Sequence, residues 1–357
     1  MRVLHLIDSL GLGGAQTVVK GVFDAQKKNK NIFLFALRKR EINTRIDHPN
    51  VKTFNSKAKY SFKPLKELKR LIKKERIEIL HCHLFRSQLF GWILKKSFPN
   101  LKLIMHEHGQ IFRNDFYYNV FMKITQKQTN LFIVVSRATK QKLIEKAKIN
   151  PKKIKVLHNF VDLSKFNKKN IKWNIKKERE KLGIKSKEFV IGFAGRLVER
   201  KGWEEFVETA KQDPMKNIKF IIAGDGKDKK VLLSKIKDQN NIKYLGYISD
   251  MNNFYNCLNC FIIPSHWEPL GLTQLEAQSC GCPVIASDIE GLNEVVNNKK
   301  DCLFFEAKDS IDLGKKITII YQNRKLREKL IKEGLKNVKK YSLKNYIKKL
   351  NEVYNEK

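Results

Sequence analysis

The stretch that decides the fold opens with Pro264-Ser265-His266-Trp267-Glu268-Pro269-Leu270-Gly271-Leu272-Thr273-Gln274-Leu275-Glu276-Ala277 and runs on to Val296. The apolar run at 261–263 before it predicts a strand, Pro269 and Gly271 predict a turn, and residues 272–279 have a helical pattern. A strand that turns through glycine into a helix directs unpaired backbone N–H groups, and the positive end of the helix dipole, at one point. Such a point suits a phosphate group.

Two carboxylates flank this predicted phosphate site, Glu268 before the turn and Glu276 inside the helix. A carboxylate beside a phosphate is electrostatically unfavourable unless it faces a neutral group that donates hydrogen bonds, as sugar hydroxyls do. The residues therefore indicate a pocket that holds a diphosphate between two carbohydrate rings, as in a nucleotide-sugar. The alternative is a surface helix that carries ordinary solvated glutamates.

The spacing of Glu268 and Glu276, with seven residues between them, resembles the signature of retaining glycosyltransferases of the GT-B fold, glycosyltransferase family 4 (glycosyl transferases group 1). The surroundings are similar too, from Pro264-Ser265 to the strand Gly281-Cys282-Pro283-Val284-Ile285-Ala286. The resemblance implies an α/β fold of two doubly wound Rossmann-like domains that face each other across a cleft. The expected divisions are an acceptor-side domain over 1–165, a nucleotide-sugar domain over 166–340, and a terminal helix over 341–357 that returns to the first domain.

Length and composition agree with two globular domains rather than a disordered or membrane-spanning chain. The sequence has 357 residues, of which 42% are hydrophobic and 31% charged, and no apolar run approaches the roughly 20 residues of a membrane span. The N-terminus, Met1 to Asp8, has a strand pattern and not that of a signal peptide.

The six cysteines do not predict a disulfide scaffold in a chain of this length. Cys257 and Cys260 form a C-x-x-C pair, and with Cys280 and Cys282 they raise the alternative of a zinc site. Because the first pair lies on an apolar stretch and the second at a helix end, we expect reduced, packed thiols instead.

The charge is strongly positive and uneven. The net charge is +37, and counting Lys and Arg against Asp and Glu gives +24 for residues 1–160 and +13 for 161–357. A cationic first half suggests an anionic partner, for which nucleic acid and anionic lipid headgroups both qualify. The alternative is a general lysine bias of the chain. The sequence contains no zinc module and no basic motif interleaved with aromatic residues that would support binding to nucleic acid. We therefore expect no nucleic-acid partner.

The segment Phe62 to Lys74 predicts a basic amphipathic helix. Its apolar stripe comprises Leu65, Leu68, Leu71 and Ile72, with lysines and Arg70 around it. A helix of this kind can lie on a membrane. Packing on the sheet with a solvated lysine face is the favoured interpretation.

A glycine-rich loop follows the first predicted strand. Gly13 and Gly14 allow close approach of the backbone to a ligand before a helix that begins near Gln16. No acidic residue ends a second strand at the distance that a nicotinamide site requires. The family resemblance implies that this loop lies near the donor phosphate, and Gln16 stands where many relatives have Glu.

Histidines end two further predicted strands of the first domain. His81 and His83 close the strand 78–83, and without a carboxylate cluster they predict packing or substrate contact rather than a metal site. The strand 101–105 leads into His106-Glu107-His108-Gly109. In the family resemblance, His108 matches the histidine that approaches the donor sugar and phosphate.

A second domain is expected where the strand and helix alternation restarts at Phe189 to Phe193, after a charged connector over 167–180. Arg196 and Lys201 stand at the mouth of that strand, where two cations would neutralise a diphosphate and stabilise its charge as it leaves. The resemblance matches them to the family's diphosphate-binding Arg and Lys. It also implies that Tyr247 and Ile248 hold the nucleobase through their main chain.

The expected site follows from these assignments. In the resemblance, the catalytic set is Glu268, His108, Arg196 and Lys201. Glu268 would bind hydroxyls of the donor sugar, and Glu276 those of the ribose. The expected donor-binding residues are Gly13, Gly14, Arg196, Lys201, Tyr247, Ile248, Glu268, Leu270, Gly271, Leu272 and Glu276. No metal and no cofactor beyond the nucleotide-sugar co-substrate are expected.

The function implied is a retaining, metal-independent glycosyltransferase that moves a sugar from a nucleotide-diphosphate sugar to a glycan or lipid-linked glycan acceptor. Assembly of lipopolysaccharide or a related cell-surface polysaccharide fits this activity, in the cytoplasm with peripheral contact to an anionic membrane at its inner face. The alternative within the fold is a nucleotide-sugar epimerase, and a basic nucleic-acid-binding protein is the third hypothesis.

Overall fold

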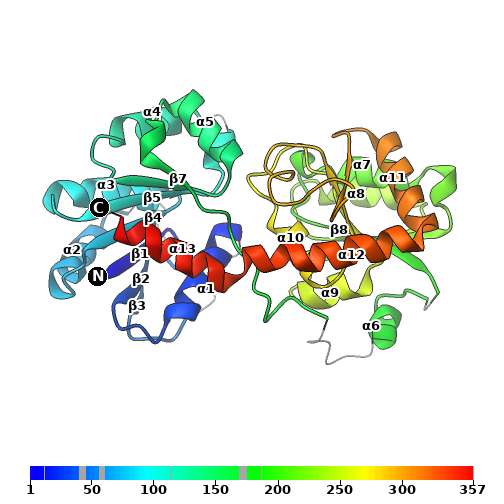
Figure 1. Cartoon of the computed structure of the whole chain (residues 1–357), viewed down its shortest axis with the longest axis horizontal. Coiled ribbons are helices and arrows are strands. Elements are labelled where there is room, and N and C mark those ends of the chain that lie inside the picture. Colours follow the sequence, from blue (N-terminus) through cyan, green and yellow to red (C-terminus); the bar gives the residue numbers. More distant parts are fainter. Residues whose placement is uncertain are drawn as a thin grey trace. The chain divides into compact units, whose positions relative to one another are not determined.

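The chain forms two compact units, seen in the computed structural model of the whole protein (Figure 1). The structure describes residues 1–11, 13–39, 46–55, 61–113, 115–168, 175–185 and 187–356. The first unit comprises residues 1–160 and 343–357, and the second comprises 161–342. The first unit therefore includes the last helix of the chain.

The first unit is built on a seven-stranded parallel sheet with the order β3-β2-β1-β4-β5-β6-β7. Its strands are β1 (Val3–Ile7), β2 (Ile32–Ala36), β3 (Val51–Thr53), β4 (Ile79–His83), β5 (Lys102–Glu107), β6 (Leu131–Val134) and β7 (Ile154–Val156). Its central strands are buried along their whole length, as expected when helices cover both faces of a parallel sheet.

The helices of the first unit are α1 (Gly14–Gln26), α2 (Pro64–Lys74), α3 (Phe85–Ser97), α4 (Phe116–Thr125), α5 (Arg137–Ala147) and α13 (Leu343–Asn355). In α2 the stripe residues Leu68, Leu71 and Ile72 are buried in the core, which confirms the packed interpretation of this basic helix. Ser136 caps α5 by accepting a hydrogen bond from the Thr139 amide, which explains why the helix begins there.

The second unit is built on a six-stranded parallel sheet with the order β10-β9-β8-β11-β12-β13. Its strands are β8 (Phe189–Ala194), β9 (Ile218–Ala223), β10 (Ile242–Gly246), β11 (Cys260–Ile263), β12 (Val284–Ser287) and β13 (Leu303–Phe305). Its helices are α6 (Ile175–Lys181), α7 (Trp203–Ala210), α8 (Lys229–Ile236), α9 (Met251–Cys257), α10 (Leu272–Ser279), α11 (Ser310–Gln322) and α12 (Arg324–Val338).

Two doubly wound α/β sheets are thus confirmed, with one local correction. The connector expected over 167–180 contains helix α6, in which Glu178 is buried and accepts hydrogen bonds from Lys181 and Asn253. This helix was not predicted from the sequence because its residues are mostly charged. Residues 169–174 of the expected connector lie outside the described residues.

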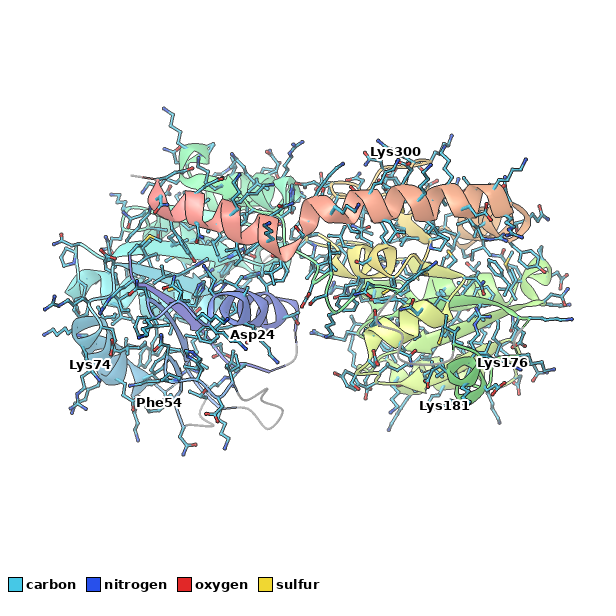
Figure 2. All side chains as sticks on the ribbon, turned by 60° about the horizontal axis from the view of Figure 1, so that its bottom comes forward. Asp24, Phe54, Lys74, Lys176, Lys181 and Lys300 are labelled. Carbon is cyan, nitrogen blue, oxygen red and sulfur yellow. The ribbon has the colours of Figure 1, made fainter. Side chains whose placement is uncertain are left out.

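All six cysteines are free and buried, in agreement with packed thiols. Lysines lie on the surface; Lys74, Lys176, Lys181 and Lys300, for example, project from the ribbon (Figure 2). Among the described residues, no helix is both long enough and apolar enough to cross a bilayer.

Candidate active site

The loops that leave β8 and β11 are locked together at the carboxyl ends of these neighbouring strands. Gly202 has φ +66°, and a Cβ built on it would lie 1.7 Å from the carbonyl oxygen of Pro264. The amide of His266 donates a hydrogen bond to the carbonyl of Arg200 at 2.9 Å. Only glycine allows this close approach. The packing of the loops places the segment 196–202 beside the segment 264–268.

This packing pairs Lys201 with Glu268. The ammonium group of Lys201 forms an ion pair and hydrogen bond with Oε1 of Glu268, and the hydroxyl of Ser265 donates to the same oxygen at 3.2 Å. The side chains are 21% and 9% exposed. Both residues are expected at the donor from the sequence, in which nothing predicts that they contact each other.

The two arginines near Lys201 make its surroundings strongly positive. Burial, and then the guanidinium groups of Arg200 and Arg196, lower the pKa of Lys201 to about 7, whereas the ion pair with Glu268 acts in the opposite direction. Arg196 itself is exposed. An anion that entered beside Lys201 would stabilise its charged form and find a second cation close by.

Helix α10 begins beside this pair with no side chain capping its N-terminus. Gly271 is the N-cap, with φ +77°, and the first turn contains no acidic residue. A Cβ on Gly271 would lie 2.2 Å from Cδ2 of Leu292, so a larger residue is excluded by both space and conformation. The backbone amides around Leu270, Gly271 and Leu272 therefore belong to a helix end that suits an anion.

Glu276 lies one turn further along α10, where it is half-buried. Its Oε2 accepts a hydrogen bond from the hydroxyl of the buried Tyr255 at 2.9 Å. Burial raises the pKa of Glu276, while the Tyr255 hydrogen bond and Lys165 oppose the rise. The carboxylate is thus held by one donor in a poorly solvated place, and it can accept further hydrogen bonds from a ligand.

The loop after β10 carries the residues expected at the nucleobase. Tyr247 is 60% exposed, and Ile248 is half-buried. They follow Gly246, which has φ +70° and ends the strand. The adjoining loops of β8 and β9 are in close contact, since the amide of Leu197 donates to the Asp225 carbonyl at 2.9 Å. A Cβ on Gly224 would lie 1.8 Å from the Gly195 carbonyl oxygen.

Aromatic and ionic contacts that sequence reasoning missed support these loops. The guanidinium of Arg200 lies 4.4 Å from the ring centroid of Trp267, within range of a cation–π contact. Nε2 of His266 lies 2.8 Å from Oε1 of Glu205 in α7. The only available signal was the position of His266 and Trp267 directly before Glu268.

The expected site residues of the first unit lie at the carboxyl ends of β1 and β5. Gly13 is the N-cap of α1, with φ +154°, and the side chain of Gln16 lies over it, because a Cβ there would meet Oε1 of Gln16 at 2.4 Å. A Cβ added to Gly14 would meet no other described atom within 4 Å, so this position is open to its surroundings.

His108 follows β5 in a turn that Glu107 organises. Oε1 of Glu107 accepts hydrogen bonds from the amides of Gly109 at 2.6 Å and Ile111 at 3.2 Å, and its other oxygen accepts from the Tyr118 hydroxyl. Burial lowers the pKa of His108 to about 3. His108 is therefore a neutral imidazole, suited to hydrogen bonding rather than to charge neutralisation.

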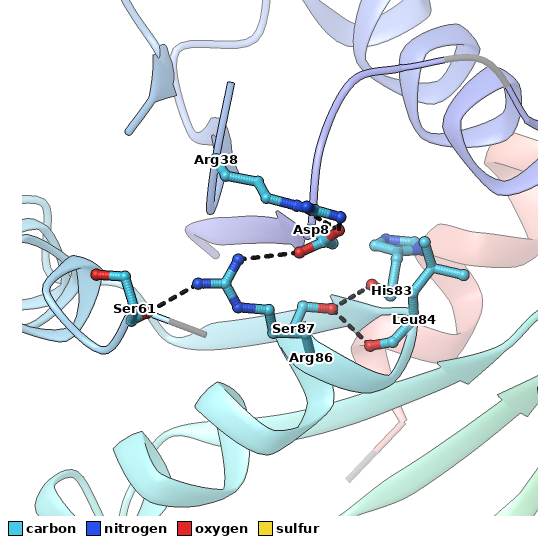
Figure 3. A network of polar contacts seen from close by, with 7 residues as sticks. All are labelled: Asp8, Arg38, Ser61, His83, Leu84, Arg86 and Ser87. Atoms are coloured by element: carbon cyan, nitrogen blue, oxygen red, sulfur yellow. Dashed lines mark hydrogen bonds and ion pairs between the residues drawn. The ribbon is translucent and has the colours of Figure 1, made fainter. Parts of the chain in front are cut away.

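A second network at the end of β1 was not predicted from sequence (Figure 3). Asp8 accepts hydrogen bonds from Nε and a terminal nitrogen of Arg38 at 2.9 and 2.6 Å, and Arg86 donates to its other oxygen at 3.1 Å. Arg86 also donates to the carbonyl of Ser61 at 2.8 Å. The structure thus assigns the acidic residue at the end of the first strand to two arginines.

Histidine side chains of the first unit lie close enough to one another to hold a metal ion. In the part of the chain that the structure describes, ring nitrogens lie within 4.8 Å of one another in two sets of three, His5 with His81 and His83, and His83 with His106 and His108. Several of the ring nitrogens lie within hydrogen-bond distance of one another or of the Tyr354 hydroxyl, whereas Nε2 of His106 and Nδ1 of His108 are buried and have no hydrogen-bond partner among the described residues.

Comparisons with known families cover both units. Residues 12–165 match the family described as Glycosyltransferase Family 4, and residues 174–337 match the family described as Glycosyl transferases group 1.

Two similar proteins are transferases. The UDP-Gal:alpha-D-GlcNAc-diphosphoundecaprenol alpha-1,3-galactosyltransferase of Escherichia coli is 32% identical over 266 residues, which cover 69% of this chain and 67% of that protein. The N,N'-diacetylbacillosaminyl-diphospho-undecaprenol alpha-1,3-N-acetylgalactosaminyltransferase of Campylobacter jejuni is 28% identical over 236 residues, covering 63% and 60%.

Solved structures share the fold over the whole chain. Anabaena Alr3699/HepE in complex with UDP and glucose superposes with a TM-score of 0.86 over 99% of both chains, at 18% sequence identity. The lipopolysaccharide outer core galactosyltransferase WaaB gives a TM-score of 0.75 over 99% of both chains, at 16% identity. At these identities the similarity establishes the two-sheet fold and not the substrate.

Proposed function

Because this chain belongs to glycosyltransferase family 4 and the glycosyl transferases group 1, we propose that it moves a sugar from a nucleotide-diphosphate sugar to a glycan or lipid-linked glycan acceptor, with retention at the anomeric carbon and without a metal ion. The observation that carries this proposal is the contact between Lys201 and Glu268 beside the uncapped start of α10. This contact places Lys201, a cation that can bind the diphosphate, beside Glu268, a carboxylate that can accept hydrogen bonds from the sugar.

The roles follow from charge. Lys201, Arg196 and the amides at the start of α10 hold the diphosphate and stabilise the charge that develops on it as the glycosyl bond breaks. This set supplies the positive charge that a metal ion provides in other transferases. Glu268 and Glu276 accept hydrogen bonds from the donor sugar and the ribose. The departing phosphate takes the proton of the acceptor hydroxyl, so that the reaction needs no pair of acid and base carboxyls.

The names of related proteins support a lipid-linked acceptor. The Escherichia coli and Campylobacter jejuni relatives are named for diphosphoundecaprenol-linked acceptors, and a Staphylococcus aureus relative for capsular polysaccharide biosynthesis. The Anabaena structure was solved with UDP. We take a UDP-sugar as the first donor to test and cell-surface polysaccharide assembly, including lipopolysaccharide, as the process.

The test is incubation of the purified protein with UDP-sugars, with and without a polyprenyl-diphosphate-linked sugar. We expect a glycosylated acceptor whose new linkage keeps the anomeric configuration of the donor, and NMR of the product reads this directly. Transfer should persist in the presence of a chelator. Epimerised donor formed without an acceptor would instead support an epimerase, and an inverted linkage would contradict retention.

Substitution of Glu276 by glutamine is expected to separate binding from stability. The amide accepts one hydrogen bond from the ribose less well than a carboxylate, so donor affinity should fall about tenfold, the loss of roughly one charged hydrogen bond. Isothermal titration with the donor measures this change. An unchanged donor affinity would refute the ribose assignment.

The same variant is expected to be at least as stable as the wild type at neutral pH. The pKa of Glu276 is raised in the folded state, so the group favours folding below its unfolded pKa and loses that contribution as pH rises through its folded pKa. At neutral pH the carboxylate is charged and poorly solvated, and a neutral amide removes that cost. Urea unfolding should show the gain at neutral pH and lose it near pH 4.

The proposed lipid-linked acceptor also favours contact of the protein with an anionic membrane. We propose helix α4 as the surface that makes this contact. The buried side of α4 comprises Tyr118, Met122 and Thr125. Its other side exposes Phe116 by 71%, Tyr117 by 83%, Val120 by 37% and Ile124 by 60%. A helix that is apolar on both sides normally lies in a core, so the exposed side suits the interface of a bilayer.

Charge around α4 supports lipid headgroups as its partner. Lys123 and Lys127 are exposed at the end of the helix, and residues 1–160 carry a net charge of +24. Aromatic rings in the acyl boundary would give a hydrophobic attraction, and lysines among anionic headgroups would give an electrostatic one. The basic helix α2 cannot supply the apolar contact, because its stripe is buried in the core.

Replacing Phe116 and Tyr117 by serine is expected to weaken binding to phosphatidylglycerol vesicles at least tenfold, since each ring contributes about 1.5–3 kcal/mol when fully buried. Co-sedimentation measures the binding. The matched control is Ile311→Ser in the second unit, where a side chain 64% exposed is removed. Equal binding by all three proteins, or by neutral vesicles, would contradict the membrane contact, and a concentration-dependent dimer lost in the double variant would assign α4 to a second copy instead.

A further inference from the structure

The order of the strands in each sheet reverses at one point. In the first sheet the chain runs outward from β1 to β2 and β3, and then crosses to β4 on the other side of β1. In sheets of this kind, ligands bind outside the carboxyl ends of the strands at the point of reversal. The second sheet reverses between β8 and β11, and Lys201 meets Glu268 there. The corresponding place in the first unit is at the carboxyl ends of β1 and β4.

Two arginines and one aspartate occupy this place (Figure 3). Asp8 directly follows β1, Arg38 follows β2, and Arg86 lies in the first turn of α3, which follows β4. The backbone amide of Arg38 donates to the Asp8 carbonyl at 3.0 Å, and both guanidinium groups donate to the Asp8 carboxylate. The side chains of Asp8, Arg38 and Arg86 are 17%, 11% and 13% exposed. The group is thus held in place and still reaches the surface.

The turn that presents Arg86 is strained. Leu84 has φ +70°, a backbone conformation that residues other than glycine rarely adopt. The hydroxyl of Ser87 holds this turn by donating to the carbonyl of Leu84 at 2.9 Å and to that of His83 (Figure 3). The guanidinium of Arg86 also lies 5.4 Å from the ring centroid of Phe90, within range of a cation–π contact. Strained residues persist where the surrounding structure fixes them, and they gather at ligand sites.

The charges of Asp8, Arg38 and Arg86 do not balance. One carboxylate faces two guanidinium groups, which leaves a surplus of one positive charge. Each guanidinium has five N–H donors, and within the described residues two of the five take part in hydrogen bonds in Arg38 and two in Arg86. Nη1 of Arg38 and Nε of Arg86 are among the nitrogens that remain available. Guanidinium groups with spare donors are well suited to the oxygens of phosphate groups.

We propose that Arg38 and Arg86 bind the diphosphate of the acceptor substrate, and that Asp8 positions both guanidinium groups. The inference rests on the proposed function, because it names the part of the lipid-linked acceptor that the first unit recognises. A diphosphate suits this group better than a neutral sugar does, since a pair of arginines with surplus positive charge gains most from a negative ligand. A diphosphate also has oxygens on two phosphorus atoms, so each arginine can bind one phosphate.

Arg38→Gln and Arg86→Gln test the proposal, with Arg70→Gln on α2 as the matched control. Each of the three changes removes one positive charge from the first unit, and the exposed Arg70 takes no part in the hydrogen bonds of Asp8. Each test variant leaves Asp8 paired with the other arginine, so no carboxylate loses all its partners. Asp8→Asn is a variant of the opposite kind, because it keeps both arginines and removes a negative charge.

The first measurement is independent of catalysis. In protein labelled with ¹⁵N-arginine, the side-chain Nε–H signals of Arg38 and Arg86 are identified by their loss in the two variants. We expect pyrophosphate to shift both signals in the wild type, and chloride at the same ionic strength to leave them in place. Signals that pyrophosphate leaves unchanged, or that chloride shifts equally, would overturn the proposal.

The affinity for pyrophosphate separates an anion site from an ion pair that serves only the fold. We expect the dissociation constant, read from the remaining arginine signal, to rise about tenfold in Arg38→Gln and in Arg86→Gln, as for the loss of a hydrogen bond to a charged group. Arg70→Gln should keep the wild-type value. Asp8→Asn should bind pyrophosphate at least as tightly as the wild type, because a negative charge has left the site. Weaker binding by Asp8→Asn would show that the group is a structural ion pair and would contradict the proposal.

The second measurement is transfer to a polyprenyl-diphosphate-linked sugar. We expect KM for this acceptor to rise about tenfold in Arg38→Gln and Arg86→Gln, while kcat and KM for the UDP-sugar stay within about twofold. Arg70→Gln should match the wild type. A rise in KM for the UDP-sugar instead would assign the arginines to the donor, against the proposal. If the wild type transfers no sugar, the proposed function fails, and the arginine signals still decide whether a diphosphate binds at this place.

Discussion

Lys201→Gln is expected to lose most transferase activity, by about 10²–10³ in kcat, because it removes a fixed cation from the point where charge develops on the diphosphate. The half-buried Lys201 is held by its ion pair with the buried Glu268, so its ammonium group needs no rearrangement when the bond breaks. Steady-state kinetics with saturating donor measure the loss. A variant that keeps more than about a tenth of the wild-type kcat would remove Lys201 from the reaction.

Stability must be controlled in this experiment, since the substitution leaves a buried carboxylate without its partner. Breaking a buried ion pair from one side typically costs about 3–5 kcal/mol, and the partial exposure of Lys201 places the expected loss at the lower end. The double variant Lys201→Gln with Glu268→Gln replaces the pair by neutral amides. We expect it to recover most of the stability and none of the activity, which distinguishes a catalytic loss from unfolding.

The second large effect is a loss of stability in mild acid. The five neighbouring histidines of the first unit, His5, His81, His83, His106 and His108, are neutral in the folded protein because burial lowers the pKa of each, that of His5 from 6.5 to about 4 and that of His108 to about 3. Groups whose folded pKa is depressed contribute stability that is complete above the unfolded pKa and is lost as pH falls through the folded pKa. For His5 alone the difference amounts to about 3 kcal/mol.

Urea unfolding between pH 7 and about 4.5 measures this loss. We expect the free energy of unfolding to fall by a few kcal/mol across that window, a large share of the roughly 5–15 kcal/mol of a typical domain. The five contributions are not additive, because the first protonated ring opposes protonation of the next. Glu276, with its raised pKa, acts in the opposite direction.

The control for the acid effect is His5→Asn, which removes one titrating ring from this group of histidines. Its slope of stability against pH should be shallower than that of the wild type. Carboxylates with lowered pKa values, such as Asp312 and Glu333, lose most of their stabilising contribution at lower pH, as the pH falls toward their folded pKa values. A stability that stays constant from pH 7 to 4.5 would contradict the neutral, buried state of the histidines.

The family resemblance and the alternation of strands and helices predicted the two doubly wound sheets, and the comparisons confirm them. The reason is that buried parallel strands read as apolar runs such as 261–263, and glycines follow them where the chain turns sharply. Helix α6 was missed because its residues are mostly charged, and only its contacts with α9 show that it packs.

The residues proposed to bind the donor in the second unit were chosen from the sequence because they follow predicted strand ends and match the motif of the family. Their mutual contact could not be named. Lys201 and Glu268 are 67 positions apart, and they meet because Gly202 allows one loop to pack against the carbonyl of Pro264. A local sequence pattern does not predict which two loops at the end of a sheet contact each other.

The histidines give the sharpest contrast. Sequence identified His81, His83 and His108 one by one, and it had no means of assigning His5, His106 or Tyr354 to the same group. Parallel register places three strands side by side, and the return of α13 brings a hydroxyl from position 354 to within 2.6 Å of His81.

Taken alone, the amino-acid sequence predicted most of the strands and helices and led to the proposal of an anion site at the start of α10 and a nucleotide-sugar ligand, because these inferences depend on neighbours along the chain. The tertiary structure decided which charges pair, which histidine rings lie within hydrogen-bond distance of one another and which side of α4 is exposed. Those properties depend on contacts between segments that are distant in sequence, and such contacts are set by the packing of whole sheets and helices.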